Sequence, residues 1–160
     1  MNSVNISIEE LQAAGFRRAG TVFPDATKVV RVQVDWPVTG FVVYIMVVNH
    51  EFEKAGTTGR KGSVFEGRMH STFSALRQVI SGARPDRPPA LWRSRKLDPF
   101  KQHAPAAIAA GHEIELWAQE FTIDTFEAKE TELNDRYRGE WTKEGWTRDG
   151  TRRWAEGDAH

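Results

Sequence analysis

The sequence predicts a single mixed α/β (α+β) domain in which a small antiparallel sheet is flanked by helices. Three observations support this prediction. The length of 160 residues suits one domain with a substantial core. Residues 42–48 form an apolar, β-branched run typical of a buried strand. Apolar residues recur at helical spacing in two later stretches, residues 64–80 and 123–138, on either side of a further alternating strand pattern.

The first 39 residues predict an N-terminal extension that contains one helix and one strand. Ser7, followed by two acidic residues, has the pattern of a helix N-cap, and Gly15 would end that helix. Residues 29–34 alternate apolar and polar side chains, as a half-buried strand does.

A hairpin is expected at the centre of the chain. Residues 42–48 should form a strand that is buried on both faces. Residues 51–56 are its expected antiparallel partner across a short turn. The glycine-containing, basic stretch 57–63 then predicts a loop.

The second half of the chain predicts two helices and a strand after the first long helix. The helix at 64–80 should bury Met69, Phe73, Leu76 and Ile80. Prolines and basic residues make the stretch 81–99 irregular, and a short helix is expected at 101–110. Residues 112–122 predict a third strand of the central sheet, and residues 123–138 predict a helix with Asp124 as its cap. The side chains expected on one face of that strand are Ile114, Leu116, Ala118 and Phe121, and those expected inward on the last helix are Phe126, Leu133 and Tyr137.

Composition excludes several classes of protein. The formal net charge is zero, with 22 basic and 22 acidic side chains, so attraction to nucleic acid requires local clustering. Cysteine is absent, which excludes disulfides and thiolate metal sites and fits a reducing cytoplasm. No signal peptide is visible, and no apolar run approaches the roughly 20 residues of a membrane helix.

Four side chains have the chemistry needed at a phosphodiester. A phenol, Tyr44, can act as a general base when a cation such as Lys54 stabilises its ionised form. A guanidinium, Arg68, can bind the scissile phosphate. Glu130 can hold one divalent ion, Mg²⁺ or Mn²⁺. His70 could add a base or phosphate donor, or be a partly exposed helix residue.

The same residues give the chain a resemblance to the GIY-YIG nuclease family. Val42-Val43-Tyr44 is similar to the first motif of the family, and Lys54-Ala55-Gly56 is similar to the second. Arg68 resembles the arginine of the following helix. Glu130, with Leu133, Tyr137 and Trp141 in register after it, resembles the metal-binding glutamate. The resemblance spans about residues 40–142 and implies a three-stranded antiparallel sheet flanked by helices, with residues 143–160 as a basic, Trp-containing tail.

Three positions depart from the family pattern. Lys54 replaces the second tyrosine, a change found in restriction-type members, where lysine supports the tyrosine base. Gly139 stands where proline is common, and Thr142 replaces the usual asparagine, which leaves a supporting contact open. Glu127 and Glu132 are rival metal ligands, but the three-residue step to Leu133 favours Glu130.

The resemblance implies a metal-dependent endonuclease that hydrolyses double-stranded DNA, with a restriction or phage-defence role as the finer expectation. Cutting both strands would require two copies, so a homodimer is a hypothesis. The alternatives are a nuclease-fold module that binds DNA or a partner without cutting, and an RNA-processing nuclease.

Basic residues outside the four form two groups that could contact DNA phosphates or bases. The first lies in the loop after the hairpin and the second in the irregular stretch, where a solvated surface loop is the competing interpretation. They are Arg60 and Lys61, and Arg84, Arg87, Arg93, Arg95 and Lys96. His103 and His112 show no metal-ligand spacing and are expected to be structural or exposed.

Overall fold

A computed structural model describes residues 4–27, 29–81 and 99–142 of the chain. The second basic group (Arg84, Arg87, Arg93, Arg95 and Lys96) and the tail 143–160 lie outside the described residues, as does the side chain of Ile80. The strands are β1 (Arg17–Pro24), β2 (Val30–Val34), β3 (Phe41–Val48), β4 (Glu51–Thr58) and β5 (Ile114–Phe121). The helices are α1 (Ile8–Ala13), α2 (Phe65–Ser81), α3 (Pro99–Ala109) and α4 (Phe126–Tyr137), with a 3₁₀ turn, η1, at Arg60–Gly62. Within these residues no helix combines the length and apolarity needed to cross a bilayer.

The sheet has five antiparallel strands in the order β2-β1-β5-β3-β4, so the expected three-stranded sheet is wrong. The predicted strand at 29–34 is present as β2, but β1 was not predicted. Gly20 and Pro24 are residues that strands usually avoid. The structure shows why position 20 is a glycine, because a Cβ there would collide with the backbone oxygen of Gln33 on β2. Together β1 and β2 extend the sheet beyond β5.

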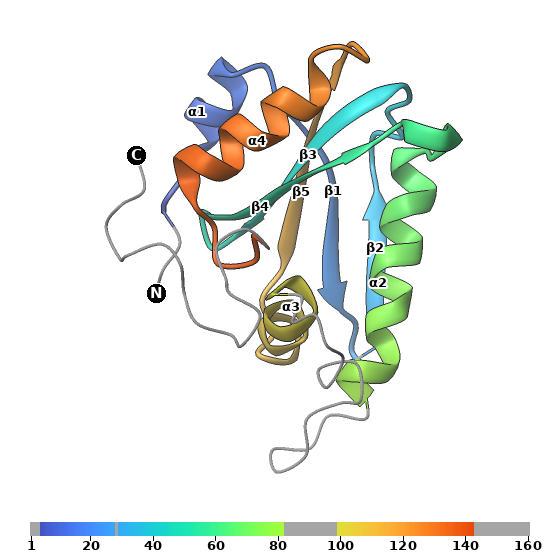
Figure 1. The fold of residues 1–160 in the computed structure, drawn as a ribbon. Helices are drawn as coiled ribbons and strands as arrows, with labels where there is room; N and C mark the ends of the chain where they lie inside the picture. Colours follow the sequence, from blue (N-terminus) through green and yellow to red (C-terminus); the bar gives the residue numbers. More distant parts are fainter. Residues whose placement is uncertain (1–3, 28, 82–98, 143–160) are drawn as a thin grey trace.

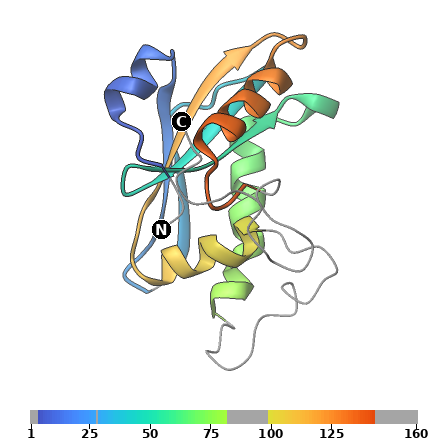
Figure 2. The same ribbon diagram turned by 60° about the vertical axis from the view of Figure 1, so that its left-hand side comes forward.

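Helices cover both faces of the sheet, and each face has its own apolar core (Figure 1). On one face α2 and α3 bury Met69, Phe73 and Leu76, as predicted, together with Phe100 and Ile108. On the other face α1 and α4 enclose a second core. Figure 2 shows α3 and α2 below and behind the hairpin, with α4 lying along it. The side chains of the second core that come from the two helices are Leu11, Phe126, Leu133 and Tyr137.

One prediction for a helix end is confirmed, and two predictions for other single residues are wrong. Ser7 caps α1 as expected, since its Oγ accepts a hydrogen bond from Glu10 N at 3.0 Å. The prediction for Phe121 was wrong, because it is an odd step from Ala118 on β5 and alternation turns it to the opposite face, where it contacts Phe16. Asp124 is not the cap of α4. The helix starts one residue later than a cap at 124 would allow, after Thr125.

The outer edge of β4 is closed by three segments that are not strands of the sheet. β4 is last in the strand order, so its outward backbone groups have no neighbouring strand to bond. The N-terminal segment, the end of α4 and the residues after α4 supply the missing partners. The bonds join Phe52 N to Val4 O (2.9 Å), Trp141 N to Glu53 O (3.0 Å), and the Asn134 side chain to both backbone groups of Ala55 (2.8 and 3.1 Å).

Trp141 should be among the residues on which stability depends most. Only 2% of it is exposed, and its ring packs edge-on against Phe100 at 5.9 Å in the α2/α3 core. Trp141→Ala should lower the free energy of unfolding by about 3–5 kcal/mol, measured by urea denaturation. Ile123→Ala is the control, because Ile123 is 53% exposed, and it should change stability by no more than about 0.5 kcal/mol. Equal losses in the two variants would contradict the assigned burial.

Candidate functional site

Tyr44 lies in the middle of β3, paired with Gly56 of β4 on one side and Ala118 of β5 on the other. Its side chain belongs to the α2/α3 face, where its ring lies 6.1 Å from the ring of Phe65 at the start of α2. Only 7% of Tyr44 is exposed. The predicted base is therefore a buried ring of which little reaches solvent.

Gly56 leaves the space that the Tyr44 ring occupies. A Cβ at Gly56 would collide with the hydroxyl oxygen of Tyr44 and lie 2.8 Å from its Cε2 atom. The ring therefore lies across β4, and its hydroxyl is held above the backbone of the outermost strand. Close approach of a neighbouring group explains why a residue without a side chain is required here.

Lys54 lies on the same face as Tyr44. It pairs with Met46, and residues directly opposite each other on antiparallel strands share a face. Its Nζ lies 5.6 Å from the centre of the Phe100 ring, so an aromatic side chain of α3 partly supports the ammonium. The fold thus brings two of the four predicted groups, the phenol and the ammonium, to one surface of the hairpin.

Arg68 and His70 are both exposed on α2 and lie on different sides of the helix. Arg68 is exposed and follows Phe65, the residue that contacts Tyr44, by three positions, so the two are neighbours on the helix surface. His70 is also exposed, but a two-residue step turns it to another side of the helix. Of these two exposed residues, Arg68 is the one that neighbours Phe65 on the helix surface.

Glu130 reaches the hairpin from the opposite face of the sheet, on α4. Contacts between the two segments show that α4 runs antiparallel to β4. Glu127 pairs with Arg60 just beyond the end of β4, and Asn134 bonds Ala55 further back along the strand. Glu130 lies between these two contacts and is half-buried. It therefore lies level with the segment that contains Gly56, over which the Tyr44 hydroxyl is held.

The two basic residues of η1 have different surroundings. Arg60 forms an ion pair with Glu127 and lies 5.5 Å above the Phe126 ring. This pair raises the pKa of Arg60 and lowers the pKa of Glu127, in each case mainly through the hydrogen bond between them. Lys61 is exposed, with a left-handed φ of 57°. Lys61 faces solvent, whereas the charge of Arg60 is partly offset within the protein.

Among the described residues, few side chains are placed to bind a metal ion at this site. Among residues 4–27, 29–81 and 99–142, no three histidine or acidic side chains gather to hold an ion. Of the rival carboxylates, Glu127 binds Arg60, and Glu132 is exposed and pairs with Lys129 at 3.2 Å. A single half-buried carboxylate such as Glu130 suits Mg²⁺, which usually keeps several waters and takes further oxygens from a phosphate.

Asn134 and Thr142 were given no role at this site by the sequence, yet they hold α4 and its continuation against β4. The Thr142 side chain is buried, and its hydroxyl lies 3.4 Å from both Glu53 O and Asn134 Oδ1. Thr142 thus ties the segment after α4 both to β4 and to α4. Only the fold could reveal this, since Glu53 and Thr142 are far apart in sequence.

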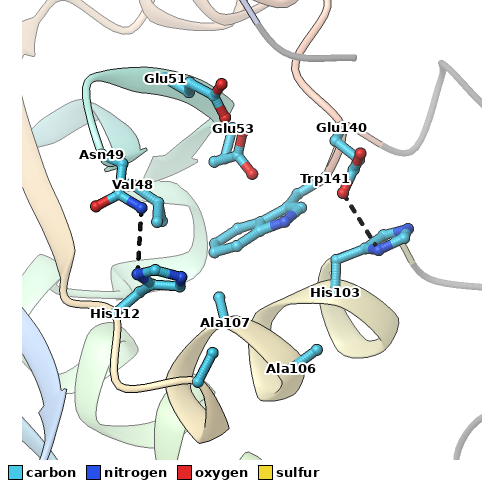
Figure 3. A pocket seen from close by; sticks show the side chains of 11 residues that line it. Val48, Asn49, Glu51, Glu53, His103, Ala106, Ala107, His112, Glu140 and Trp141 are labelled. Carbon is cyan, nitrogen blue, oxygen red and sulfur yellow. Dashed lines mark hydrogen bonds and ion pairs between the residues drawn. The ribbon is translucent and has the colours of Figure 1, made fainter. Parts of the chain in front are cut away.

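A second site lies at the turn end of the same hairpin, where a cavity of about 290 Å³ opens between β4, α3 and the segment after α4. Figure 3 shows His112 directed to Asn49, and His103 directed to Glu140, on either side of Trp141. The ring Nδ1 atoms lie 3.1 Å from Asn49 Nδ2 and 3.4 Å from Glu140 Oε1. The two histidines line one pocket, although nothing in their spacing predicted it. The carboxylates that line it are Glu51, Glu53 and Glu140.

No protein-family model and no curated protein matches the sequence. The solved structures that align with this chain include the following two. A mutant of EndoII from bacteriophage T4 aligns with a TM-score of 0.57 and 16% sequence identity, over 84% of this chain and 96% of that one. The restriction endonuclease HPY188I in complex with product DNA aligns with a TM-score of 0.45 and 10% identity, over 75% of this chain and 63% of that one. The likeness to EndoII shows that this chain shares its fold.

Gly56→Ala should displace the Tyr44 ring, because the added methyl would occupy the place of the hydroxyl. The chain has two tyrosines, Tyr44 and Tyr137, so spectra of protein with labelled tyrosine rings should show one shifted and one unchanged signal. Gly67→Ala is the matched control, because nothing lies within 4 Å of a Cβ at Gly67. It should leave both signals in place and stabilise α2 by up to about 1 kcal/mol. Unchanged signals in Gly56→Ala would refute the assigned contact.

Glu51 should make stability depend on pH. Desolvation, and then repulsion from Glu140, raise the pKa of Glu51 above its ordinary value of 4.5. A raised folded-state pKa means that the contribution of Glu51 to stability is present below pH 4.5 and lost as the pH rises through the raised value. Glu51→Gln should therefore gain in melting temperature relative to the wild type between pH 4 and pH 7. Glu132→Gln, at an exposed position, is the control, and equal gains in the two variants would contradict the assignment.

Proposed function

We propose that this protein is a metal-dependent endonuclease that hydrolyses phosphodiester bonds of double-stranded DNA. One observation carries the proposal. The Tyr44 hydroxyl is held over Gly56 in β4, the edge strand of the sheet, and α4 runs along the same strand and carries Glu130. The fold shared with EndoII, a phage endonuclease, supports a nuclease rather than another phosphate-binding protein.

Each side chain has a role that follows from its chemistry. Tyr44 is the general base that accepts a proton from the attacking water, and Lys54, on the same face of the hairpin, assists it. Arg68 binds the scissile phosphate and offsets the charge that develops on it. Glu130 holds Mg²⁺ or Mn²⁺, which when bound supplies charge stabilisation at the leaving oxygen.

The finer assignment is a GIY-YIG-type enzyme with a restriction or phage-defence role. It depends on Lys54, which stands in the second motif where restriction-type members carry lysine. Since one such centre hydrolyses one bond at a time, cutting both strands would involve two copies of the chain. Lys61, exposed at the end of the hairpin, is suited to a contact with the DNA backbone. The same role for Arg60 would require it to leave Glu127.

The test is cleavage of supercoiled plasmid and of linear duplex DNA with Mg²⁺ or Mn²⁺. Glu130→Gln, Arg68→Ala and Tyr44→Phe should each lower the cleavage rate by about 100-fold or more, because each removes a group that acts in the transition state. Glu132→Gln is the matched control on the same helix, since Glu132 is exposed and pairs only locally, and it should cut at the wild-type rate.

Three results would change the assignment. Cleavage lost in Glu132→Gln but kept in Glu130→Gln would move the metal ligand to Glu132. Cleavage of RNA but not DNA would replace the substrate class. Failure to cut either nucleic acid with any divalent ion, together with retained DNA binding, would favour a nuclease-fold module that binds without cutting.

A further inference from the structure

The side chain of Asn134 takes the place of a neighbouring strand at the edge of β4. Its Oδ1 accepts a hydrogen bond from Ala55 N at 2.8 Å, and its Nδ2 donates one to Ala55 O at 3.1 Å. An amide side chain offers the same donor and acceptor as a backbone peptide group, so it can satisfy both outward groups of one edge residue. This pair of bonds ties one point of α4 to one residue of β4.

The consequence of this tie is a fixed position for Glu130. Residues four apart on a helix lie on the same side, about 6 Å apart along its axis. Two residues of a strand span about 7 Å. Because α4 runs antiparallel to β4, a step from Asn134 back to Glu130 corresponds to a step from Ala55 on to Thr57. Glu130 is thereby held beside the strand segment that includes Gly56.

We infer that Asn134 is a positioning residue for the metal-binding carboxylate. Its bonds to Ala55 set the position of Glu130 along β4, so that the carboxylate lies level with the Tyr44 hydroxyl. This inference rests on the proposed nuclease function. The Arg60–Glu127 pair at the other end of α4 is exposed on both sides, with 58% and 53% of the side chains accessible. Exposed pairs hold geometry weakly, so of these two polar contacts the half-buried bonds of Asn134 are the ones able to fix the register, beside the apolar packing of α4.

The test compares Asn134→Ala and Asn134→Asp with Leu11→Ala. Asn134→Ala removes both bonds to Ala55, while Asn134→Asp keeps the acceptor for Ala55 N but loses the donor to Ala55 O. Leu11→Ala is the control for lost stability alone, because Leu11 is buried in the α1/α4 core and bonds no atom of Asn134 through its side chain. Circular dichroism is used to find conditions in which all three variants are folded.

Three readouts are measured on each folded protein. Exchange of the Ala55 amide proton reports the tie itself and should accelerate in Asn134→Ala only. Paramagnetic broadening of the Gly56 and Thr57 amide signals during Mn²⁺ titration reports the position of the ion without any reaction. The Mn²⁺ concentration that gives half-maximal cleavage should rise about tenfold or more in Asn134→Ala, to a smaller extent in Asn134→Asp, and should stay at the wild-type value in Leu11→Ala.

The outcomes separate this inference from the function on which it rests. Wild-type protein that neither cuts nucleic acid nor shows Mn²⁺ broadening would refute the nuclease proposal, and the inference with it. A wild type that cuts and binds Mn²⁺, combined with wild-type Mn²⁺ dependence in Asn134→Ala despite faster Ala55 exchange, would refute the positioning role alone. Equal losses in Asn134→Ala and Leu11→Ala would likewise assign Asn134 to stability alone.

Discussion

The closure of the β4 edge is the constraint on which the rest of this structure depends. An outermost strand exposes a row of backbone donors and acceptors that must find partners. Here the N-terminal segment, Asn134 and Trp141 supply them in turn along the strand. Each partner also brings something else into place. Trp141 carries the chain from the α4 face to the α2/α3 core, where it contacts Phe100, and Asn134 fixes the helix that carries Glu130.

The candidate site combines groups from both faces of the sheet, which is possible only at an edge. Tyr44 and Lys54 belong to the α2/α3 face, whereas α4 packs its apolar side on the opposite face. A carboxylate in the middle of that second face would be separated from the phenol by the sheet itself. Gly56 removes the side chain that would otherwise lie between the Tyr44 hydroxyl and the edge. Gly56 and α4 thus together allow groups from the two faces of the sheet to form one candidate site.

Burial patterns that arise within one segment were predictable, and pairings between distant segments were not. Residues 42–48 and the inward side of α2 were predicted because β-branched runs and helical spacing are properties of neighbouring residues. β1 was missed because Gly20 and Pro24 are unusual in strands and because its formation depends on pairing with β5 and β2. Phe121 was assigned to the wrong face by one step of alternation. The pocket of His103 and His112 joins residues that only the docking of α3 brings together.

The sequence by itself determined the mixed α/β class, the central hairpin, the long helices and the four side chains whose chemistry suits a phosphodiester. These follow from residue type and local periodicity, which a single chain displays directly. The tertiary structure decided the five-stranded sheet, the approach of the Tyr44 hydroxyl to Gly56 and the alignment of α4 with β4. Such features depend on hydrogen bonds between residues as far apart as Ala55 and Asn134, and local patterns carry no record of which distant partner completes an open strand edge.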